Sequence, residues 1–152
     1  MSDKNGIVNI NKPAGITSFK VVMAVKKILD CPKAGHTGTL DPMATGVLPV
    51  CIGKGTKIIP YISDDLKEYM AKIVLGKVTD TLDGEGKVLS SNQNWKSLSN
   101  TEIEQVIIKY LGIFDQIPPM YSAVHYKGEK LYKLARKGKK VEREPRQVEI
   151  KE

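Results

Sequence analysis

The stretch from residue 35 to 57 reads GHTGTLDPMATGVLPVCIGKGTK and restricts the fold more than any other part of the chain. Its five glycines and two prolines break helices and favour turns, so no long helix can run through it. Asp41 lies inside the stretch, and Pro42 keeps that aspartate out of the α-helical region. The sequence therefore predicts a stiff loop around a lone carboxylate. A buried strand is expected over 47–53, and its proline predicts an edge or bulged position.

The segments on either side predict helices and strands in mixed order. A capping signal at Thr17 and Ser18 and a stop at Cys31 and Pro32 define the first helix. Its expected apolar side consists of Phe19, Val21, Val22, Val25, Ile28 and Leu29. The other expected elements are a strand over 6–13, a strand over 69–79 that enters a hairpin turn over 79–88, a helix from the capping box Ser99–Glu102 to Gly112, a short helix over 129–137 ended by Gly138, and a strand over 145–151. Without regular βαβ spacing, this order predicts an α+β fold.

The charge of the chain suggests what it binds. At 152 residues the chain is long enough for one domain, and its formal net charge of +7 favours a polyanionic partner such as nucleic acid or an anionic membrane surface. Many soluble proteins are equally basic, however. Between Lys127 and Arg143, eight cations and two anions are interleaved with tyrosines and leucines. This segment predicts a face that follows phosphates, and the alternative is a solvated lysine-rich surface.

Residue spacing excludes several kinds of site. Cys31 and Cys51 stand 20 positions apart without a CxxC pair, and no metal-ligand spacing appears. GKGTK lacks the spacing of a phosphate loop, and TDTLDGEG lacks the acidic ligands of a calcium loop. We therefore expect reduced thiols and no metal, nucleotide or calcium site. The N-terminus lacks a secretory pattern and no apolar run approaches the ~20 residues of a membrane span, so we expect a cytoplasmic protein without membrane contact.

Two roles for Asp41 follow from its surroundings. A carboxylate held rigidly beside open glycine backbone can act as a nucleophile toward an electrophilic carbon or as a general base. The alternative is a turn residue whose side chain caps the backbone, and local physics alone favours this alternative.

Three motifs in order contain or flank Asp41: NKPAGITS, GHTGTLDPMATGVLPVCIGKGTK and KEYMAKIVLGKVTDTLDGEG. Together with PPMYSAVHYKGEKLYKLARKG further along, they resemble the TruB family of tRNA pseudouridine synthases, which convert uridine 55 in the T loop of tRNA to pseudouridine. The resemblance implies a mixed, largely antiparallel sheet flanked by helices. It also implies chemistry without a cofactor, and a monomeric parent enzyme that binds the T stem-loop of tRNA.

The resemblance assigns roles to single residues. It implies that Asp41 is the catalytic nucleophile, with attack on C1′ of the ribose or on C6 of the base left open. It implies that Tyr69 stacks on the flipped base, against the alternative of a core aromatic. RNA contacts are implied for His36, Lys12, Gly35, Thr37, Thr39, Asp83, Lys130 and Arg143. For His36, Lys12 and Asp83 the alternatives are a loop histidine, a solvated lysine and a turn aspartate.

The resemblance covers the N-terminal part of the family's catalytic domain. We expect residues 1–152 to form a partial catalytic domain with a basic RNA-contacting insertion at about 119–145. We expect no counterpart of the C-terminal part of that domain or of the family's RNA-binding PUA domain. We also expect no counterpart of the arginine that pairs with the aspartate, since Arg136, Arg143 and Arg146 do not match its motif. We therefore expect an open sheet edge or an exposed apolar face. The alternative function is a non-catalytic tRNA-binding or tRNA-folding module.

Overall fold

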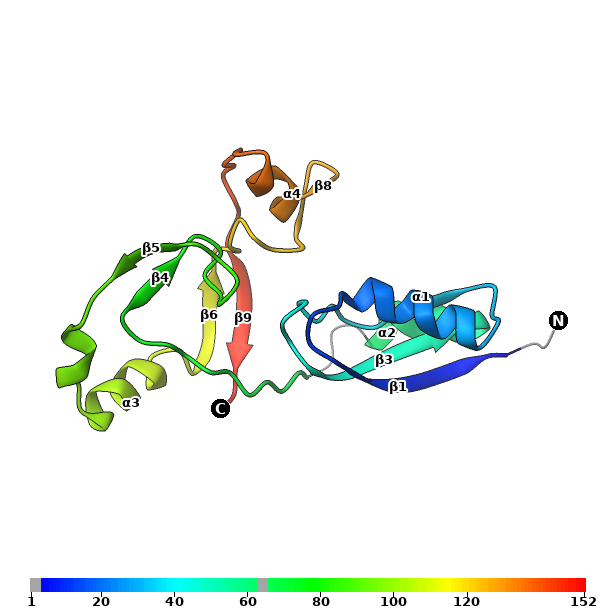
Figure 1. The fold of residues 1–152 in the computed structure, drawn as a ribbon, viewed down its shortest axis with the longest axis horizontal. Helices are drawn as coiled ribbons and strands as arrows, with labels where there is room; N and C mark the ends of the chain where they lie inside the picture. Colours follow the sequence, from blue (N-terminus) through cyan, green and yellow to red (C-terminus); the bar gives the residue numbers. More distant parts are fainter. Residues whose placement is uncertain (1–3, 63–65) are drawn as a thin grey trace. The chain divides into compact units, whose positions relative to one another are not determined.

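The computed structural model describes residues 4–62 and 66–152. The chain divides into two compact units, Met1–Ala71 (unit 1) and Lys72–Glu152 (unit 2) (Figure 1). Both units combine helices with strands, which confirms the predicted α+β class. In the described part of the chain, every strand pair is antiparallel.

Helices and strands follow the chain in this order. Unit 1 contains β1 (Gly6–Lys12), α1 (Ser18–Ile28), β2 (Ala34–His36), β3 (Gly46–Ile52), the 3-10 helix η1 (Gly53–Ile58) and α2 (Ile59–Ile62). Unit 2 contains β4 (Lys77–Thr79), β5 (Val88–Ser91), the 3-10 helix η2 (Asn94–Ser97), α3 (Asn100–Ile108), β6 (Gly112–Gln116), β7 (His125–Tyr126), β8 (Glu129–Lys130), α4 (Leu131–Arg136) and β9 (Arg146–Ile150).

Unit 1 is a three-stranded sheet in the order β1-β3-β2, with α1 packed on one face (Figure 1). The pairing of β1 with β3 runs from Gly6 opposite Ile52 to Lys12 opposite Gly46. The core between helix and sheet consists of Val21, Val22 and Val25 from α1, Leu48, Val50 and Ile52 from β3, and Cys31. Burial of such apolar surface stabilises a fold by about 25 cal/mol per Å², so this core is the main source of stability in unit 1.

Because of Pro49, strand β3 was expected at an edge or bulged position, and this prediction is wrong on both counts, since the pairing of β3 with β1 has no register shift. β3 is the central strand, with Pro49 opposite Asn9 of β1. The Pro49 carbonyl accepts a hydrogen bond from Thr37 N at 3.2 Å, so the missing N–H of Pro49 faces the same side as β2. The last residue pair between β2 and β3 is His36 with Val50. The hydrogen bond that Pro49 cannot donate would therefore lie past the end of the pairing between β2 and β3.

Helix α1 begins where the sequence predicts. The Thr17 hydroxyl accepts a hydrogen bond from Lys20 N at 3.2 Å and caps the first turn. The helix ends at Ile28, before the Cys31–Pro32 stop. Its apolar side is narrower than expected, because Phe19 is 67% exposed and Ile28 is 78% exposed.

Unit 2 contains three antiparallel strand pairs: the hairpins β4–β5 and β7–β8, and the pair β6–β9, whose strands are separated in the chain by β7, β8 and α4. The predicted hairpin turn after Thr79 and the predicted strand near the C-terminus are confirmed. The predicted helix over 129–137 is shorter, because Glu129 and Lys130 form β8 before α4 begins. Gly138 follows α4 with φ +72, the left-handed conformation that commonly ends a helix.

Helix α3 shows the predicted capping box. The Ser99 hydroxyl accepts from Glu102 N, and Glu102 Oε2 accepts from Ser99 N at 2.8 Å. The helix ends at Ile108, and Gly112 begins β6 instead of closing the helix. No residue of α3 is buried, and Val106, Ile107 and Ile108 are each at least half exposed. This agrees with the expected exposed apolar face.

The predicted strand over 69–79 is mostly wrong. Only Lys77–Thr79 forms a strand, and residues 66–74 have no regular structure. Met70 is fully exposed and Ile73 is 71% exposed. A sequence of strand-forming residues becomes a strand only when a neighbour pairs with its backbone, and no described residue pairs with this stretch.

Within the described residues, the structure contains no helix with the length and apolar content that crossing a bilayer requires.

Candidate active site

Asp41 lies at the start of a tight turn that follows the loop after β2. Its carbonyl accepts a hydrogen bond from Ala44 N at 3.1 Å, and Pro42 takes the second position of the turn. Proline suits this position because its fixed φ matches the turn. The Asp41 residue itself is exposed. The backbone is therefore restricted at the aspartate while the residue stays open to solvent.

The residue before Asp41 is held by Ser18, the first residue of α1. The Ser18 hydroxyl accepts from Leu40 N at 2.9 Å and donates to Leu40 O at 2.9 Å. Ser18 is only 2% exposed, so these two bonds lie away from competing water. One side chain thus satisfies both backbone groups of Leu40.

The residue after Asp41 is held by the NKPAG segment. Pro42 O accepts from Gly15 N at 2.8 Å and from Lys12 Nζ at 3.2 Å. Lys12 Nζ also donates to Pro13 O at 3.0 Å and to Ile16 O at 2.9 Å. Gly15 has φ +84, a conformation that glycine adopts without strain.

Lys12 was expected to contact RNA, with a solvated lysine as the alternative. Its relative exposure is 0%, which contradicts the solvated alternative, and its RNA contact stays a prediction. A buried charge is costly unless hydrogen bonds satisfy it, and three carbonyls do so here. Lys12 instead joins the end of β1 to the Asp41 turn.

Lys12, Gly15 and Ser18, which we call the loop anchors, fix Leu40 and Pro42 on either side of Asp41. A carboxylate mounted on a fixed turn and exposed to solvent can meet an electrophilic carbon without first reorganising its own backbone. Sequence reasoning had not assigned this positioning role to any of the three. Lys12 and Gly15 belong to the NKPAG segment and Ser18 follows it closely, so the signal was the motif itself.

The GHTG residues line up on and after β2. Gly35 pairs with Cys51 and His36 pairs with Val50, so both belong to the sheet and not to a loop. A Cβ on Gly35 would lie 3.0 Å from Ile59 Cδ1, which explains why a glycine fits there. Thr37 is tied to Pro49 by its N–H, and Thr39 is exposed near the turn. Their predicted RNA contacts stay predictions.

Tyr69 is 64% exposed and lies in the irregular stretch before β4. The alternative of a core aromatic is therefore wrong for this structure. An exposed ring is available for stacking on a base, and that role stays a prediction.

Asp83 lies in the turn between β4 and β5. Its Oδ1 accepts from Thr81 Oγ1 at 2.6 Å and from Glu85 N at 2.9 Å, and its carbonyl accepts from Thr79 Oγ1 at 2.7 Å. These hydrogen bonds show that Asp83 stabilises the turn, as the alternative of a turn aspartate predicts. Its RNA contact stays a prediction.

Lys130 and Arg143 lie in the basic segment of unit 2. Lys130 pairs with His125 in the β7–β8 hairpin, and Arg143 lines a cavity of about 300 Å³ with His125 and Leu131. Cationic and aromatic side chains meet here, with Lys127 Nζ 5.5 Å from the Tyr126 ring. Lys137 donates to Glu129 Oε1 at 2.6 Å and thereby lowers the pKa of Glu129. The hairpin and α4 therefore present cations from folded elements, with Lys127, Lys133 and Arg136 exposed and Lys130 half-buried.

The described residues offer little for a metal or a thiol reaction. They contain no group of three or more His, Cys, Asp or Glu side chains placed to hold an ion. Cys31 and Cys51 are both free and buried, and burial raises the pKa of the Cys51 thiol. A buried thiol with a raised pKa is a poor nucleophile. The candidate chemistry in unit 1 therefore centres on Asp41.

Comparisons with known proteins agree on one family. The sequence model described as TruB family pseudouridylate synthase (N terminal domain) matches residues 26–152. The chain is 56% identical over 146 residues to tRNA pseudouridine synthase B of Clostridium tetani and 55% identical to that of Clostridium novyi. Each match covers 96% of this chain and 50% of the relative, so the chain spans about half the length of the curated relatives it matches.

A solved structure resembles this chain over most of its length. The crystal structure of a Cbf5-Nop10-Gar1 complex contains a chain that matches 95% of this one, with a TM-score of 0.56 and 28% sequence identity. The match covers 33% of that chain.

Proposed function

Because this chain belongs to the TruB family of pseudouridylate synthases, we propose that the protein isomerises uridine to pseudouridine at position 55 in the T loop of tRNA. The observation that carries the proposal is the Asp41 turn, an exposed aspartate whose two neighbours are fixed by the loop anchors. Relatives that are more than 50% identical to this chain over 146 residues are named tRNA pseudouridine synthase B.

The reaction exchanges one bond of the ribose for another. The bond from C1′ to N1 breaks, the uracil turns, and a bond from C1′ to C5 forms. The hydrogen on C5 leaves as a proton and N1 gains a proton, so substrate and product have the same composition. Asp41 serves as the nucleophile that makes the exchange possible, and the fixed turn lowers the cost of placing it.

The target base must leave its stack before Asp41 can reach it. Extrusion costs a few kcal/mol, which an aromatic platform and a side chain that fills the vacated space offset. Tyr69 supplies the platform, since its ring is exposed. His36, on the strand before the Asp41 loop, contacts the T loop where the base departs.

The basic segment of unit 2 holds the rest of the T stem-loop. Between residues 119 and 145, Lys130 and Arg143 are half-buried, and the cations of Lys127 and Arg136 lie over the rings of Tyr126 and Tyr132. A folded single-stranded loop is recognised mainly through its shape, stacking and phosphates. The arrangement of cations beside tyrosines suits that mode.

Tritium release tests the proposal. A tRNA transcript labelled with tritium at C5 of its uridines loses the label when C5 bonds to C1′. We expect release with the wild-type protein and a loss of at least about 1,000-fold with Asp41→Asn, because the amide is not a nucleophile. Asp115→Asn makes the same chemical change on an exposed residue of β6 and is expected to leave release unchanged.

The outcomes separate catalysis from binding. We expect Asp41→Asn to keep its affinity for tRNA, since the substitution removes no cation. Full tritium release by Asp41→Asn would overturn the assignment of the nucleophile. A wild-type protein that binds tRNA without releasing tritium would overturn the enzymatic proposal.

A further inference from the structure

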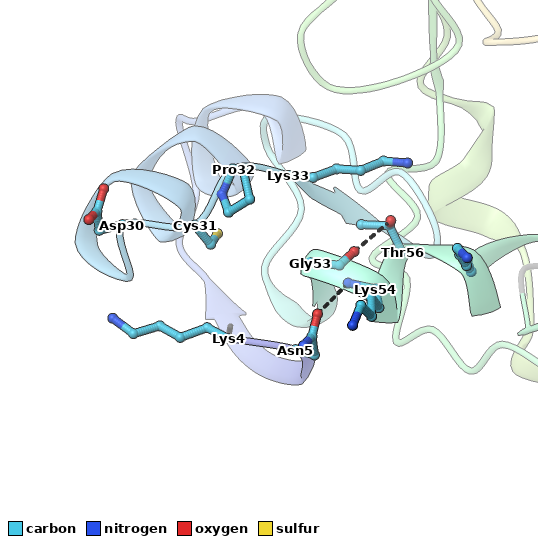
Figure 2. Close-up of a pocket in the computed structure, with 10 residues that line it drawn as sticks. Lys4, Asn5, Asp30, Cys31, Pro32, Lys33, Gly53, Lys54 and Thr56 are labelled. Carbon is cyan, nitrogen blue, oxygen red and sulfur yellow. Dashed lines mark hydrogen bonds between the residues drawn. The ribbon is translucent and has the colours of Figure 1, made fainter. Parts of the chain in front are cut away.

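A cavity of about 430 Å³ lies in unit 1, at the end of the sheet away from Asp41 (Figure 2). At this end Gly6 pairs with Ile52, whereas Lys12 pairs with Gly46 at the end next to the Asp41 turn. The two ends of β1 are roughly 20 Å apart at about 3.4 Å per residue. The cavity is therefore separate from the candidate active site.

Lysine dominates the lining of this cavity. Lys4, Lys33, Lys54 and Lys57 surround it, and Asp30 supplies the one carboxylate among the described lining residues. Lys4 Nζ donates to Leu29 O at 2.7 Å, at the C-terminal end of α1. The other three lysines come from two segments of the chain, Lys33 from the loop before β2 and Lys54 and Lys57 from η1.

Hydrogen bonds fix the segments that carry these lysines. Gly53 N–H donates to Lys33 O at 2.8 Å, and Lys54 N–H donates to Asn5 Oδ1 at 2.6 Å. Gly53 has φ +56, and a Cβ there would overlap Asn5, so glycine is needed for this close packing. Thr56 Oγ1 donates to Gly53 O at 2.9 Å and closes the turn (Figure 2). The backbones of Lys33 and Lys54 are thus held beside each other before any ligand arrives.

The chemistry of the lining points to phosphate. An ammonium on a flexible stem attracts phosphate as a point charge and needs no particular orientation. No aromatic side chain occurs among the described lining residues, so the cavity offers no platform for stacking a base. A nucleotide read through its base fits poorly, whereas a sugar–phosphate backbone fits well.

We propose that Lys33, Lys54 and Lys57 bind phosphates of an RNA backbone, as a second contact roughly 20 Å from the target uridine. The inference rests on the proposed function, since the RNA is the molecule whose uridine meets Asp41. The contact is independent of RNA sequence and anchors the substrate outside the loop that is modified.

Salt dependence of tRNA binding tests the contact. The cavity variant Lys33→Gln, Lys54→Gln, Lys57→Gln is compared with the control variant Lys87→Gln, Lys96→Gln, Lys109→Gln, whose lysines are exposed in unit 2. Each variant lowers the formal net charge of the chain from +7 by three. We expect the cavity variant to flatten the slope of log K against log salt by about 2, at roughly 0.7 to 0.9 per phosphate contact, and the control to change it by less than about 0.5. Equal slopes for the two variants would overturn the proposal.

Acetylation of the wild-type chain gives a second measurement that needs no variant. We expect bound tRNA to protect Lys33, Lys54 and Lys57 from an amine-acetylating reagent, read by mass spectrometry, while inorganic phosphate at the same phosphate concentration does not. Equal protection by inorganic phosphate assigns the cavity to free phosphate and contradicts an RNA contact. Absence of protection by tRNA contradicts any ligand at these lysines.

The two proposals fail separately. Tritium release by the wild type, combined with identical slopes for cavity and control variants, removes the cavity contact and leaves the enzymatic function intact. Protected lysines and a flattened slope without tritium release remove the enzymatic function and leave the RNA contact intact.

Discussion

Unit 1 and unit 2 have similar lengths but gain their order in different ways. Among the described residues, eight buried hydrophobic side chains belong to unit 1, and two, Leu131 and Leu134, belong to unit 2. Unit 1 folds around a core between α1 and β3, whereas unit 2 relies on hairpin ladders, turn side chains and a helix cap. The candidate nucleophile lies in the unit with the core, so its position depends on packing more than on local sequence.

The largest expected difference between the units concerns leucine removal. Leu48→Ala in β3, at 1% exposure, is expected to destabilise unit 1 by about 2 to 5 kcal/mol, because it leaves a cavity in the core. Leu89→Ala in β5, at 66% exposure, is expected to cost less than about 1 kcal/mol. Hydrogen exchange measured by mass spectrometry reports the opening free energy of each unit separately. Comparable losses at the two positions would show that unit 2 has a core of its own.

A smaller difference is expected for lysine removal. Lys12→Met keeps the length of the side chain but leaves the carbonyls of Pro13 and Ile16 without their donor, which is expected to cost about 2 to 4 kcal/mol. Lys96→Met, at an exposed position in unit 2, is expected to stay within about 0.5 kcal/mol of wild type. Hydrogen exchange of the Gly15 and Ala44 amides reports directly whether Lys12 still fixes the Asp41 turn, because both amides donate hydrogen bonds within it. Unchanged protection of both amides in Lys12→Met would mean that the lysine is not a loop anchor.

The smallest expected difference is the response of the two capped helices to acid. The hydrogen bond from Ser99 N lowers the pKa of Glu102 below its ordinary value of 4.5, so the folded helix favours the ionised carboxylate. This lowered pKa stabilises α3 at pH values above 4.5, and the stabilisation is lost as the pH falls through the lowered pKa of Glu102. Helix α1 is capped by Thr17 and has no acidic residue in its first turn, so its cap does not titrate.

Amide exchange at several pH values, corrected for the intrinsic rate, distinguishes the two helices. We expect α3 to lose protection relative to α1 as the pH drops, and Glu102→Gln to remove that dependence. A parallel loss in both helices would place the acid sensitivity elsewhere in the chain.

What the sequence predicted correctly was mostly local. The capping box of α3, the cap of α1 and the turn between β4 and β5 depend on residues no more than nine positions apart, and all three were found. The family assignment depended on motifs in order and is also confirmed. These features can be recognised without knowing what packs against them.

What the sequence missed depended on distant neighbours. Pro49 predicts an edge strand by itself, yet the short length of β2 makes a central position acceptable. The strand-forming residues over 66–74 had no pairing partner among the described residues. Lys12 looked like a surface cation because no local signal shows that three carbonyls will surround it. For the site, the motif identified Asp41, but its anchors could be identified only from the fold.

The loop anchors hold Asp41 through backbone atoms of its neighbours, and this determines where inherited variation is tolerated. Any residue but proline at position 40 offers the same N–H and C=O to Ser18, so natural selection on this contact acts on the serine, 22 positions away in the sequence. Selection on the Pro42 carbonyl acts on Lys12, 30 positions away. In a scan of all single substitutions, intolerance caused by the anchors should therefore appear far from the aspartate in sequence.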